Sequence, residues 1–451
     1  MFLKSIFSLA ILVFIFFTVN TSAAILTVTT NEDTDDGVCD AHCSLREALG
    51  TVTSGVTHTI IFAHELRGTT IHLTRTLETN GRPFIDGPNK RRITVKGDGT
   101  FRIFRTRGIT QIDGLIITDG GEQESEGGGF YNTGTLYLIN CLVKNNRATN
   151  GGGIYSYYGR VWIYNSTISE NISTAENSTG GVELFRSSTR LVNSTISGNV
   201  SQSANGGAGG VRFMENTDWF INGSTIAYNI SNSLVDGSAG GFVPYRGNPG
   251  SIFNVILANN IGFNPDYFGW SLGAKNSLIG ITDSRSGFYD GYNGCIVGSA
   301  KNPVDPQLGL LTDNGGSIPT HALLNTSRAI DTGNNSLLIN SSTDQRGFNR
   351  IINNTVDIGA FEYNSQPAEI FPTITGKVTN SSGRGVSGVR VKLQSANGEE
   401  RFAITNPFGY YRFININSGT YTIEATDKRF SFATQTFFAE EATEYANFIA
   451  E

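Results

Sequence analysis

The sequence predicts an all-β protein in which a parallel β-helix is followed by a small β-sandwich. Three observations support this prediction: a repeat in the middle of the chain, a composition that suits short strands and tight turns, and a change to alternating strands after residue 372. Glycine provides 54 of the 451 residues and charged residues only 16%, while no segment has a sustained helical period. A chain of this length exceeds one compact globule, so we expect an elongated solenoid with an appended module.

The repeat consists of five segments that each begin with two or three glycines and end with an asparagine. The last glycine and the closing asparagine are always 17 to 19 residues apart, whereas the loops between segments vary in length. The last glycines are Gly129, Gly153, Gly181, Gly210 and Gly241, and the closing asparagines are Asn146, Asn171, Asn199, Asn229 and Asn260. Repeats of this length with short β-type runs are typical of the coils of a stacked solenoid.

Asparagine and aliphatic positions predict how the coils stack. Asparagine tolerates the left-handed backbone of a corner, and its amide can bond to the same residue one coil away. Inner asparagines precede the closing ones at Asn140, Asn165, Asn193, Asn222 and Asn254. An inward aliphatic ladder is expected at Val143, Ile168, Ile196, Ile226 and Leu257. With residues 57–126 read as earlier coils, roughly ten coils about 4.8 Å apart would form a rod of about 45–50 Å.

The N-terminal segment predicts export. Lys4 precedes an apolar run at residues 6–17, and small residues at 21–24 offer a cleavage site near Ala23/Ala24. This is the layout of a secretory signal peptide, and the run is too short for a good transmembrane span. A retained N-terminal anchor is the alternative. We therefore expect a secreted or cell-surface protein.

The charge of the chain limits its partners. The formal net charge is −6, and the chain has no long run of basic residues. This argues against nucleic acid or an anionic membrane as partner. An extracellular or cell-surface glycan or protein remains as the expected partner.

The stretch CDAHCSLREAL at residues 39–49 most resembles a site. In an exported chain the default interpretation of Cys39 and Cys43 is a disulfide, whereas a zinc site would need more ligands than His42 supplies. Ser44 and Glu47 have the spacing of a capping box, which predicts a short helix. We expect a helical lid, held in place by this disulfide, that covers the open N-terminal coil. Without the lid, the unpaired strand edges of that coil would promote aggregation.

An acidic turn before this stretch raises the question of calcium. Asn31, Asp33 and Asp35 have alternating oxygen ligands, but glycine follows at position seven and His42 stands at position twelve. The match to a calcium loop is weak, and a solvated acidic turn is the better interpretation. We assign neither a metal nor a cofactor to the chain.

A catalytic site is not expected, although β-helices often host polysaccharide lyases and hydrolases. Such an enzyme needs carboxylates that converge on one face. The acids of the repeats occupy different positions within their coils, namely Glu170, Glu176, Glu183, Glu215, Asp218 and Asp236. An enzyme of the pectate-lyase-like class is kept as the alternative function.

An aromatic cluster offers a candidate surface for stacking on sugar rings. Its members are Tyr155, Tyr157, Tyr158 and Trp162, which fall within eight residues of each other. Strand alternation should bury some of them and expose others. The alternative is that they pack as core or edge residues.

Two regions resemble known families of exported proteins. VTTNEDTDDGVCDAHCSLREAL resembles the start of CSLREA-domain proteins, while NPDYFGWSLGAKNSLIG and the later VDPQLGLLTDNGGSIPTHALL and DQRGFNRIINNTVDIGAFEY resemble the choice-of-anchor Q ending. The repeats between them are similar to those of chlamydial polymorphic outer-membrane proteins. The resemblance covers about residues 25–363 and implies a right-handed, pectin-lyase-like β-helix that is secreted or lies at the cell surface, with no established chemistry.

The same resemblance bears on the remaining cysteines. The family usually carries cysteines at the positions of Tyr267 and Cys295, so Cys295 lacks its usual partner. Cys141 lies about 20 Å or more of stacked coils away, beyond the reach of a disulfide. We therefore predict that both cysteines are unpaired and that Cys141 occupies the buried slot that Ser166 and Ser194 fill in later coils.

The C-terminal segment resembles the carboxypeptidase regulatory-like domain. The matching stretches are ITGKVTNSSGRGVSGVRVKL and TNPFGYYRFININSGTYTIEA, whose strands alternate as in an antiparallel sandwich. That module resembles a small prealbumin-like β-sandwich without catalytic residues. The resemblance implies a spacer, stabiliser or adhesion unit.

The domain organisation follows from these observations. We expect a signal peptide at 1–24, an N-terminal cap with the CSLREA helix at 25–56, the parallel β-helix at 57–300, its C-terminal end region at 301–363, a linker at 364–372 and the sandwich at 373–451. The predicted function is that of a non-enzymatic, exported protein that presents a repetitive surface for adhesion or cell-surface attachment, with glycans as candidate ligands.

Overall fold

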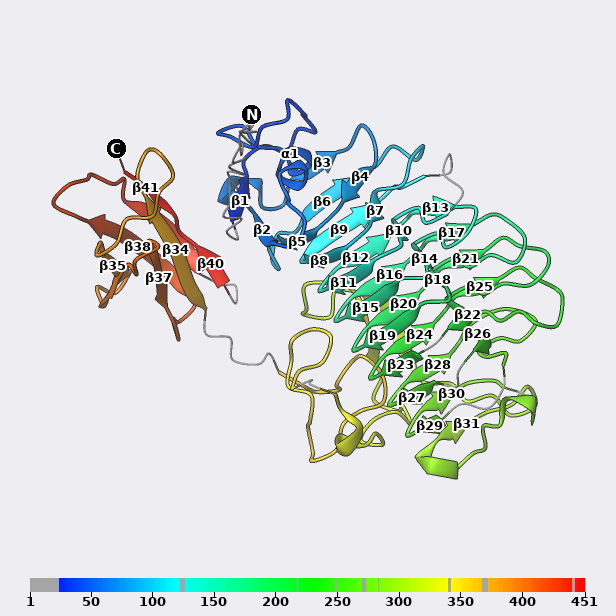
Figure 1. The fold of residues 1–451 in the computed structure, drawn as a ribbon. Coiled ribbons are helices and arrows are strands. Elements are labelled where there is room, and N and C mark those ends of the chain that lie inside the picture. The colour runs from blue at the N-terminus through cyan, green and yellow to red at the C-terminus, as the bar shows by residue number, and fades with distance from the viewer. Residues whose placement is uncertain are drawn as a thin grey trace, which may run out of the picture.

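The computed structural model shows a parallel β-solenoid followed by a small β-sandwich (Figure 1). It describes residues 24–121, 126–216, 218–247, 250–269, 273–282, 284–339, 342–366, 372–439 and 443–450. The predicted fold class is confirmed. The predicted signal peptide lies outside the described residues, apart from Ala24. No helix in the described ranges is long and apolar enough to cross a membrane.

Four parallel sheets, here named A to D, make up the described part of the solenoid. Sheet A has ten strands: β1 (Ile25–Val28), β2 (Thr57–Phe62), β5 (Arg82–Asp86), β8 (Ile109–Asp113), β11 (Thr135–Ile139), β15 (Arg160–Tyr164), β19 (Ser188–Val192), β23 (Asp218–Asn222), β27 (Ser251–Phe253) and β29 (Gly273–Lys275). Sheet B has ten: β3 (Thr70–His72), β6 (Ile93–Lys96), β9 (Leu115–Thr118), β12 (Leu142–Lys144), β16 (Thr167–Ser169), β20 (Thr195–Ser197), β24 (Thr225–Ala227), β28 (Ile256–Ala258), β30 (Leu278–Ile279) and β31 (Ile296–Val297).

The other two sheets of the solenoid are smaller. Sheet C has seven described strands: β4 (Leu77–Thr79), β7 (Phe104–Thr106), β10 (Phe130–Asn132), β14 (Ile154–Tyr157), β18 (Val182–Phe185), β22 (Val211–Asn216) and β26 (Phe242–Gly247). Sheet D has four: β13 (Arg147–Ala148), β17 (Ile172–Ser173), β21 (Val200–Ser201) and β25 (Ile230–Ser231). A coil in the middle of the solenoid runs through sheets C, A, B and D in turn, as β14 to β17 do.

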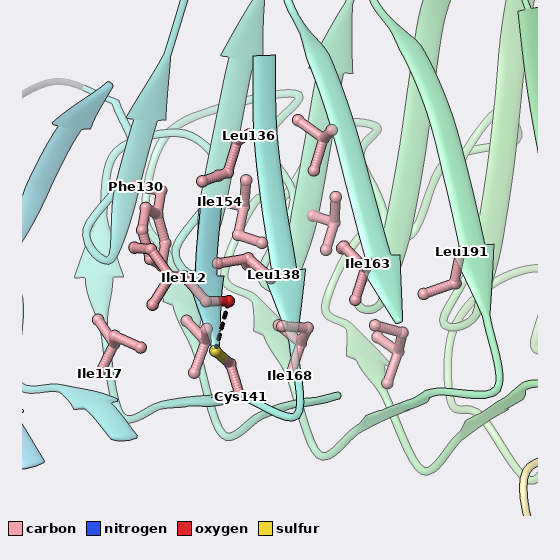
Figure 2. Packing of buried hydrophobic residues seen from close by; sticks show 14 of the residues in the cluster. Ile112, Ile117, Phe130, Leu136, Leu138, Cys141, Ile154, Ile163, Ile168 and Leu191 are labelled. Atoms are coloured by element: carbon pink, nitrogen blue, oxygen red, sulfur yellow. Dashed lines mark hydrogen bonds between the residues drawn. The ribbon is translucent and has the colours of Figure 1, made fainter. Parts of the chain in front are cut away.

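The aliphatic ladder lies inside the solenoid as predicted. Its five residues are register partners on successive strands of sheet B and are at most 1% exposed. Figure 2 shows how Ile117 and Ile168 of this sheet face Leu138 and Ile163 of sheet A across the core. Because inward residues of one coil cover those of the next, the apolar core is continuous along the solenoid.

The two asparagine positions have separate roles. Asn140, Asn165, Asn193 and Asn254 adopt positive φ at the corner between sheets A and B, whereas Gly223 takes that conformation in place of Asn222. The closing asparagines form the amide ladder instead, with Nδ2 of each donating to Oδ1 of the next, from Asn146 through Asn171, Asn199 and Asn229 to Asn260, at 2.9–3.0 Å. The ladder ends on Asp266, which accepts from Asn260 Nδ2 at 2.9 Å.

The two remaining cysteines are both buried and free, as predicted. The backbone N–H of Cys141 donates to the hydroxyl of Ser166 at 3.0 Å, and the N–H of Ser166 donates to Ser194 in the same way. Figure 2 shows the Cys141 thiol directed at the carbonyl of Ile112. Burial raises the pKa of this thiol to about 12, so it is inert in the core.

A short helix next to a disulfide forms a lid over the N-terminal coil. Cys39 and Cys43 form a disulfide, and helix α1 (Leu45–Gly50) begins at the predicted capping box of Ser44 and Glu47. The helix contacts β1 and β4. Below it, the Arg46 guanidinium donates to both carboxylate oxygens of Asp33, at 2.9 and 2.8 Å, and the two side chains are only 9% and 2% exposed.

The segment after the last coil covers the outer face of sheet B. It contains β32 (Leu308–Thr312) and β33 (Thr320–Leu323), and it runs back along the solenoid (yellow in Figure 1). Thr167 donates to the Pro319 carbonyl, Thr195 to Gln345, and the Ala360 N–H to Thr225. Strands β16, β20, β24 and β28 of sheet B are therefore buried on both faces. Short 3-10 helices complete the chain: η1 (His64–Leu66), η2 (Ser284–Ser286), η3 (Tyr292–Gly294) and η4 (Asn335–Leu337).

The C-terminal domain has its own core between two sheets. One sheet orders β37 (Tyr410–Phe413), β34 (Thr373–Thr379) and β40 (Thr443–Tyr445), with β41 (Phe448–Ile449) also paired to β34. The other orders β36 (Glu400–Ile404), β35 (Arg390–Ser395), β38 (Gly419–Thr426) and β39 (Gln435–Ala439). The sandwich is mainly antiparallel, but β40 and β41 run parallel to β34. Ile374, Val391, Ile423 and Phe448 fill the space between the sheets.

The amide ladder gives a testable prediction. Asn199 is fully buried, accepts from the N–H and Nδ2 of Asn171, and donates to Ile168 O and Asn229 Oδ1. Asn199→Ala leaves several buried polar groups without partners, so it should lower the free energy of unfolding by about 3 kcal/mol or more. Urea denaturation measures the loss. The exposed Asn232→Ala is the control and should change stability by less than about 0.5 kcal/mol; equal effects would disprove the role of the ladder.

The N-terminal lid gives a second prediction. Asp33→Asn removes the charge that pairs with the buried Arg46, which should lower stability by roughly 3–5 kcal/mol. If the lid shields the first coil, the variant should also self-associate on mild heating, as measured by light scattering. Glu65→Gln, at an exposed carboxylate nearby, should do neither. A variant that unfolds earlier but stays monomeric would refute the shielding role.

Candidate functional site

Sheet A presents the most accessible outer face of the solenoid. Along β11 and β15 every second side chain is buried in the core, and the alternate ones are partly or fully exposed. On sheet B, the strands β16, β20, β24 and β28 are covered by the segment that follows the last coil. On sheet C the outward Glu183 and Arg212 are only 2% and 7% exposed, because loops at the end of sheet D lie over them. The open face of sheet A is therefore the candidate ligand-binding surface.

The structure separates the predicted aromatic cluster. Tyr155 and Tyr157 lie on β14 of sheet C, Tyr158 forms the corner with φ of 54°, and Trp162 lies beyond that corner on β15 of sheet A. The four residues therefore occupy two different faces. Proximity in sequence could not show this, because the position of the corner at Tyr158 and Gly159 decides it.

The tyrosines on sheet C form a small cluster with their neighbours in the next coil. The Tyr157 ring stacks on Phe185 with centroids 5.5 Å apart, and Arg186 lies over both Phe185 and Tyr158. The Arg186 guanidinium also pairs with Glu215 at 2.6 Å. Tyr155 stacks on Tyr131 of the preceding coil. These rings pack mainly on one another, so they form a ridge on the surface.

Trp162 belongs to a groove on sheet A that holds about 380 Å³. Trp162, Arg190 and Phe220 are register partners on β15, β19 and β23 and form its floor. Two rings from flanking coils support this floor. Tyr137 meets Trp162 edge-to-face at 4.5 Å, and Phe253 meets Phe220 in the same way at 5.3 Å.

One wall of the groove comes from the segment that follows the last coil and precedes the sandwich. Ile339, Ser342 and Thr343 line the groove together with residues of sheet A. Asn193 joins the wall to the floor, because its Nδ2 donates to Asn165 Oδ1 at 2.7 Å and to the Thr343 carbonyl at 3.2 Å. Sequence reasoning could not anticipate this wall, since it is contributed from about 150 residues further along the chain.

Sheet A also holds a pair of carboxylates that was not predicted from the sequence. Asp86 and Asp113 are register partners on β5 and β8, and both line a pocket of about 250 Å³. The Tyr445 hydroxyl of the C-terminal domain donates to Asp86 Oδ2 at 3.0 Å, and Asn140 Nδ2 donates to Asp113 Oδ1 at 3.0 Å. Burial raises the pKa of Asp86, and the bond from Tyr445 opposes that rise. The signal was present, because Ile-Asp-Gly occurs twice, one coil apart, at residues 85–87 and 112–114.

The acids of the repeats take up other contacts. Asp218 pairs with Arg190 at 2.7 Å, and Asp236 pairs with Arg285. Glu183 is buried beneath the loop that contains Asn177, with Arg212 at 3.9 Å. Because this distance is long, burial outweighs the attraction of the guanidinium and raises the pKa of Glu183 to about 7.

The side chains of the weak calcium match make contacts within the protein, and both of its carboxylates are paired with arginines. Asp33 accepts from Arg46 and Thr74, Asp35 pairs with Arg75, and the Asn31 amide donates to the Thr70 carbonyl. In the part of the chain that the structure describes, no three His, Cys, Asp or Glu side chains are grouped so that they could hold a metal ion.

The fold and its open face define a β-solenoid protein with an appended β-sandwich. Residues 373–449 match the family model of the carboxypeptidase regulatory-like domain, which supports the resemblance drawn from the sequence for this part of the chain. The match covers strands β34 to β41 and leaves the solenoid outside it. No curated protein matches the chain.

The buried Glu183 gives a prediction about pH. Burial raises the pKa of Glu183 from 4.5 to about 7, so the folded protein keeps this side chain protonated at pH values at which the unfolded chain has already lost the proton. The stability of the folded protein therefore falls as the pH rises towards 7. Between about pH 5 and pH 8 the wild type should lose roughly 2 kcal/mol more stability than Glu183→Gln. Thermal unfolding at both pH values measures the difference. Glu215→Gln, at a carboxylate that is 38% exposed, should track the wild type; parallel curves for all three proteins would contradict the assignment.

Proposed function

We propose that this is an exported, non-enzymatic protein that uses the outer face of its solenoid for adhesion or cell-surface attachment through glycans. The observation that carries the proposal is the open aromatic face of sheet A, where Trp162 and Phe220 line a groove beside polar side chains. Aromatic faces together with a few fixed polar groups are the usual chemistry of ligand pockets.

Sequence and cap both support export. The N-terminal segment has the layout of a signal peptide, and a disulfide at Cys39 and Cys43 suits an oxidising compartment. We assign the cap to the CSLREA family and the segment over sheet B to the choice-of-anchor Q region. In this proposal the C-terminal sandwich acts as a spacer or attachment unit.

One observation favours a second candidate function. Asp86 and Asp113 are register partners on adjacent strands that both line one pocket. Adjacent strands are about 4.8 Å apart, a spacing that is compatible with the roughly 5 Å between the two carboxyl groups of retaining glycosidases. A polysaccharide-cleaving enzyme is therefore the alternative. Loss of polymer cleavage in Asp86→Asn and Asp113→Asn would identify it, whereas the absence of cleavage by the wild type would leave attachment as the function.

Attachment is tested with the mature chain, residues 25–451. The fluorescently labelled protein should bind intact bacterial surfaces or immobilised polysaccharides, and soluble glycan fragments should compete, because the aromatic face is proposed to hold sugars. Flow cytometry and a glycan array measure this binding. The heat-unfolded chain is the control for non-specific adsorption. Failure to bind any surface or glycan would overturn the proposal, as would release of shortened products.

A further inference from the structure

We propose that the groove on sheet A binds an acidic polysaccharide, with carboxylated or sulfated sugars, whose chain follows the axis of the solenoid. This inference rests on the proposed function and names the ligand class of the same surface. It is carried by the order aromatic, cation, aromatic of Trp162, Arg190 and Phe220 on three successive coils.

The spacing of the coils fits an extended sugar chain. Adjacent strands of a sheet are about 4.8 Å apart, so Trp162 and Phe220 stand about 10 Å apart along the solenoid axis. One coil advances by a distance comparable to one sugar unit in an extended polysaccharide. Three consecutive units would then face Trp162, Arg190 and Phe220 in turn.

The two aromatic side chains are suited to hold sugars at both ends of this row. The C–H groups on the face of a pyranose pack against aromatic rings as other apolar surfaces do. Trp162 and Phe220 are each supported from the coil outside the groove, by Tyr137 and Phe253 respectively. The floor is therefore preorganised, and a ligand need not order it.

The charge of this face differs from that of the whole chain. The chain carries a net charge of −6. On the sheet A strands β15, β19, β23, β27 and β29, however, the described outward side chains include Arg160, Arg190 and Lys275 against the single acid Asp218. The pair of Arg190 and Asp218 is partly exposed, at 35% and 60%. Because such exposed pairs contribute only about 0–1 kcal/mol, a carboxylate or sulfate of the ligand can compete for Arg190.

The size of the groove suits a small ligand. It holds about 380 Å³ between the sheet and the wall at Ser342 and Thr343. That volume is within the range of small-ligand sites. The hydroxyls of the wall and the amide of Asn165 supply hydrogen bonds that suit sugar hydroxyls.

The test uses the mature chain and three kinds of oligosaccharide matched in length: uronate oligomers, sulfated oligomers and neutral hexose oligomers. Isothermal titration calorimetry should show binding of at least one acidic series, at least about tenfold tighter than the neutral series. The preference should weaken at high salt because an ionic contact is screened. Neutral oligomers that bind as tightly as both acidic series would overturn the proposal.

Variants locate the binding to the groove. Trp162→Ala and Phe220→Ala should each weaken binding about tenfold or more, and Arg190→Gln should remove the preference for acidic oligomers. Tyr157→Ala is the matched control, because this exposed aromatic residue lies on sheet C, outside the groove, and the variant should bind as the wild type does. Circular dichroism confirms that each variant is folded.

The outcomes separate this inference from the proposed function. If the groove variants attach to cells or glycans as well as the wild type, the groove assignment is wrong while attachment stands. An equal loss in Tyr157→Ala would also refute the assignment. If the wild type attaches to no surface at all, the proposed function itself fails.

Discussion

The buried ladder of side-chain amides fixes the geometry on which the rest of the solenoid depends. Each closing asparagine before Asn260 bonds to the asparagine of the next coil and to a backbone carbonyl of the coil before, as Asn199 does with Asn229 and Ile168. These groups have no access to water, so a slip of one residue would leave them without partners and would turn every outward side chain inward. The register of Trp162, Arg190 and Phe220 follows from this constraint.

What covers the solenoid decides which surface remains for a ligand. The lid closes the first coil, with the buried ion pair of Arg46 and Asp33 beneath it. The segment that follows the last coil buries the outer faces of β16, β20, β24 and β28 in sheet B, and the loops at sheet D bury Glu183 and Arg212 on sheet C. Sheet A retains an outer face on which aromatic and charged side chains are accessible along several coils, and the wall at Ser342 and Thr343 borders the groove on this face.

The sequence predicted the coils well because their determinants are local. Glycines, closing asparagines and alternating strands recur within each repeat, and the structure places the aliphatic ladder and the slot of Cys141 where that pattern indicated. The site was harder to predict. Tyr157 and Trp162 are five residues apart in sequence but lie on different sheets, and Thr343 reaches the groove from a distant segment. Asp86 and Asp113 could not be found from the repeat pattern, because they lie on the less regular coils that precede the clear repeats.

The acid pair also limits where an acidic ligand can lie on sheet A. Asp86 and Asp113 stand on the coils that precede Tyr137, and Tyr445 of the C-terminal domain contacts the first of them. Their negative charge repels an anionic polymer at that end, whereas Arg190 and Lys275 attract it towards the later coils. The sandwich meanwhile occupies part of the surface beside Asp86. Charge and coverage therefore act in the same direction, and both favour binding over the stretch from Trp162 to Phe220.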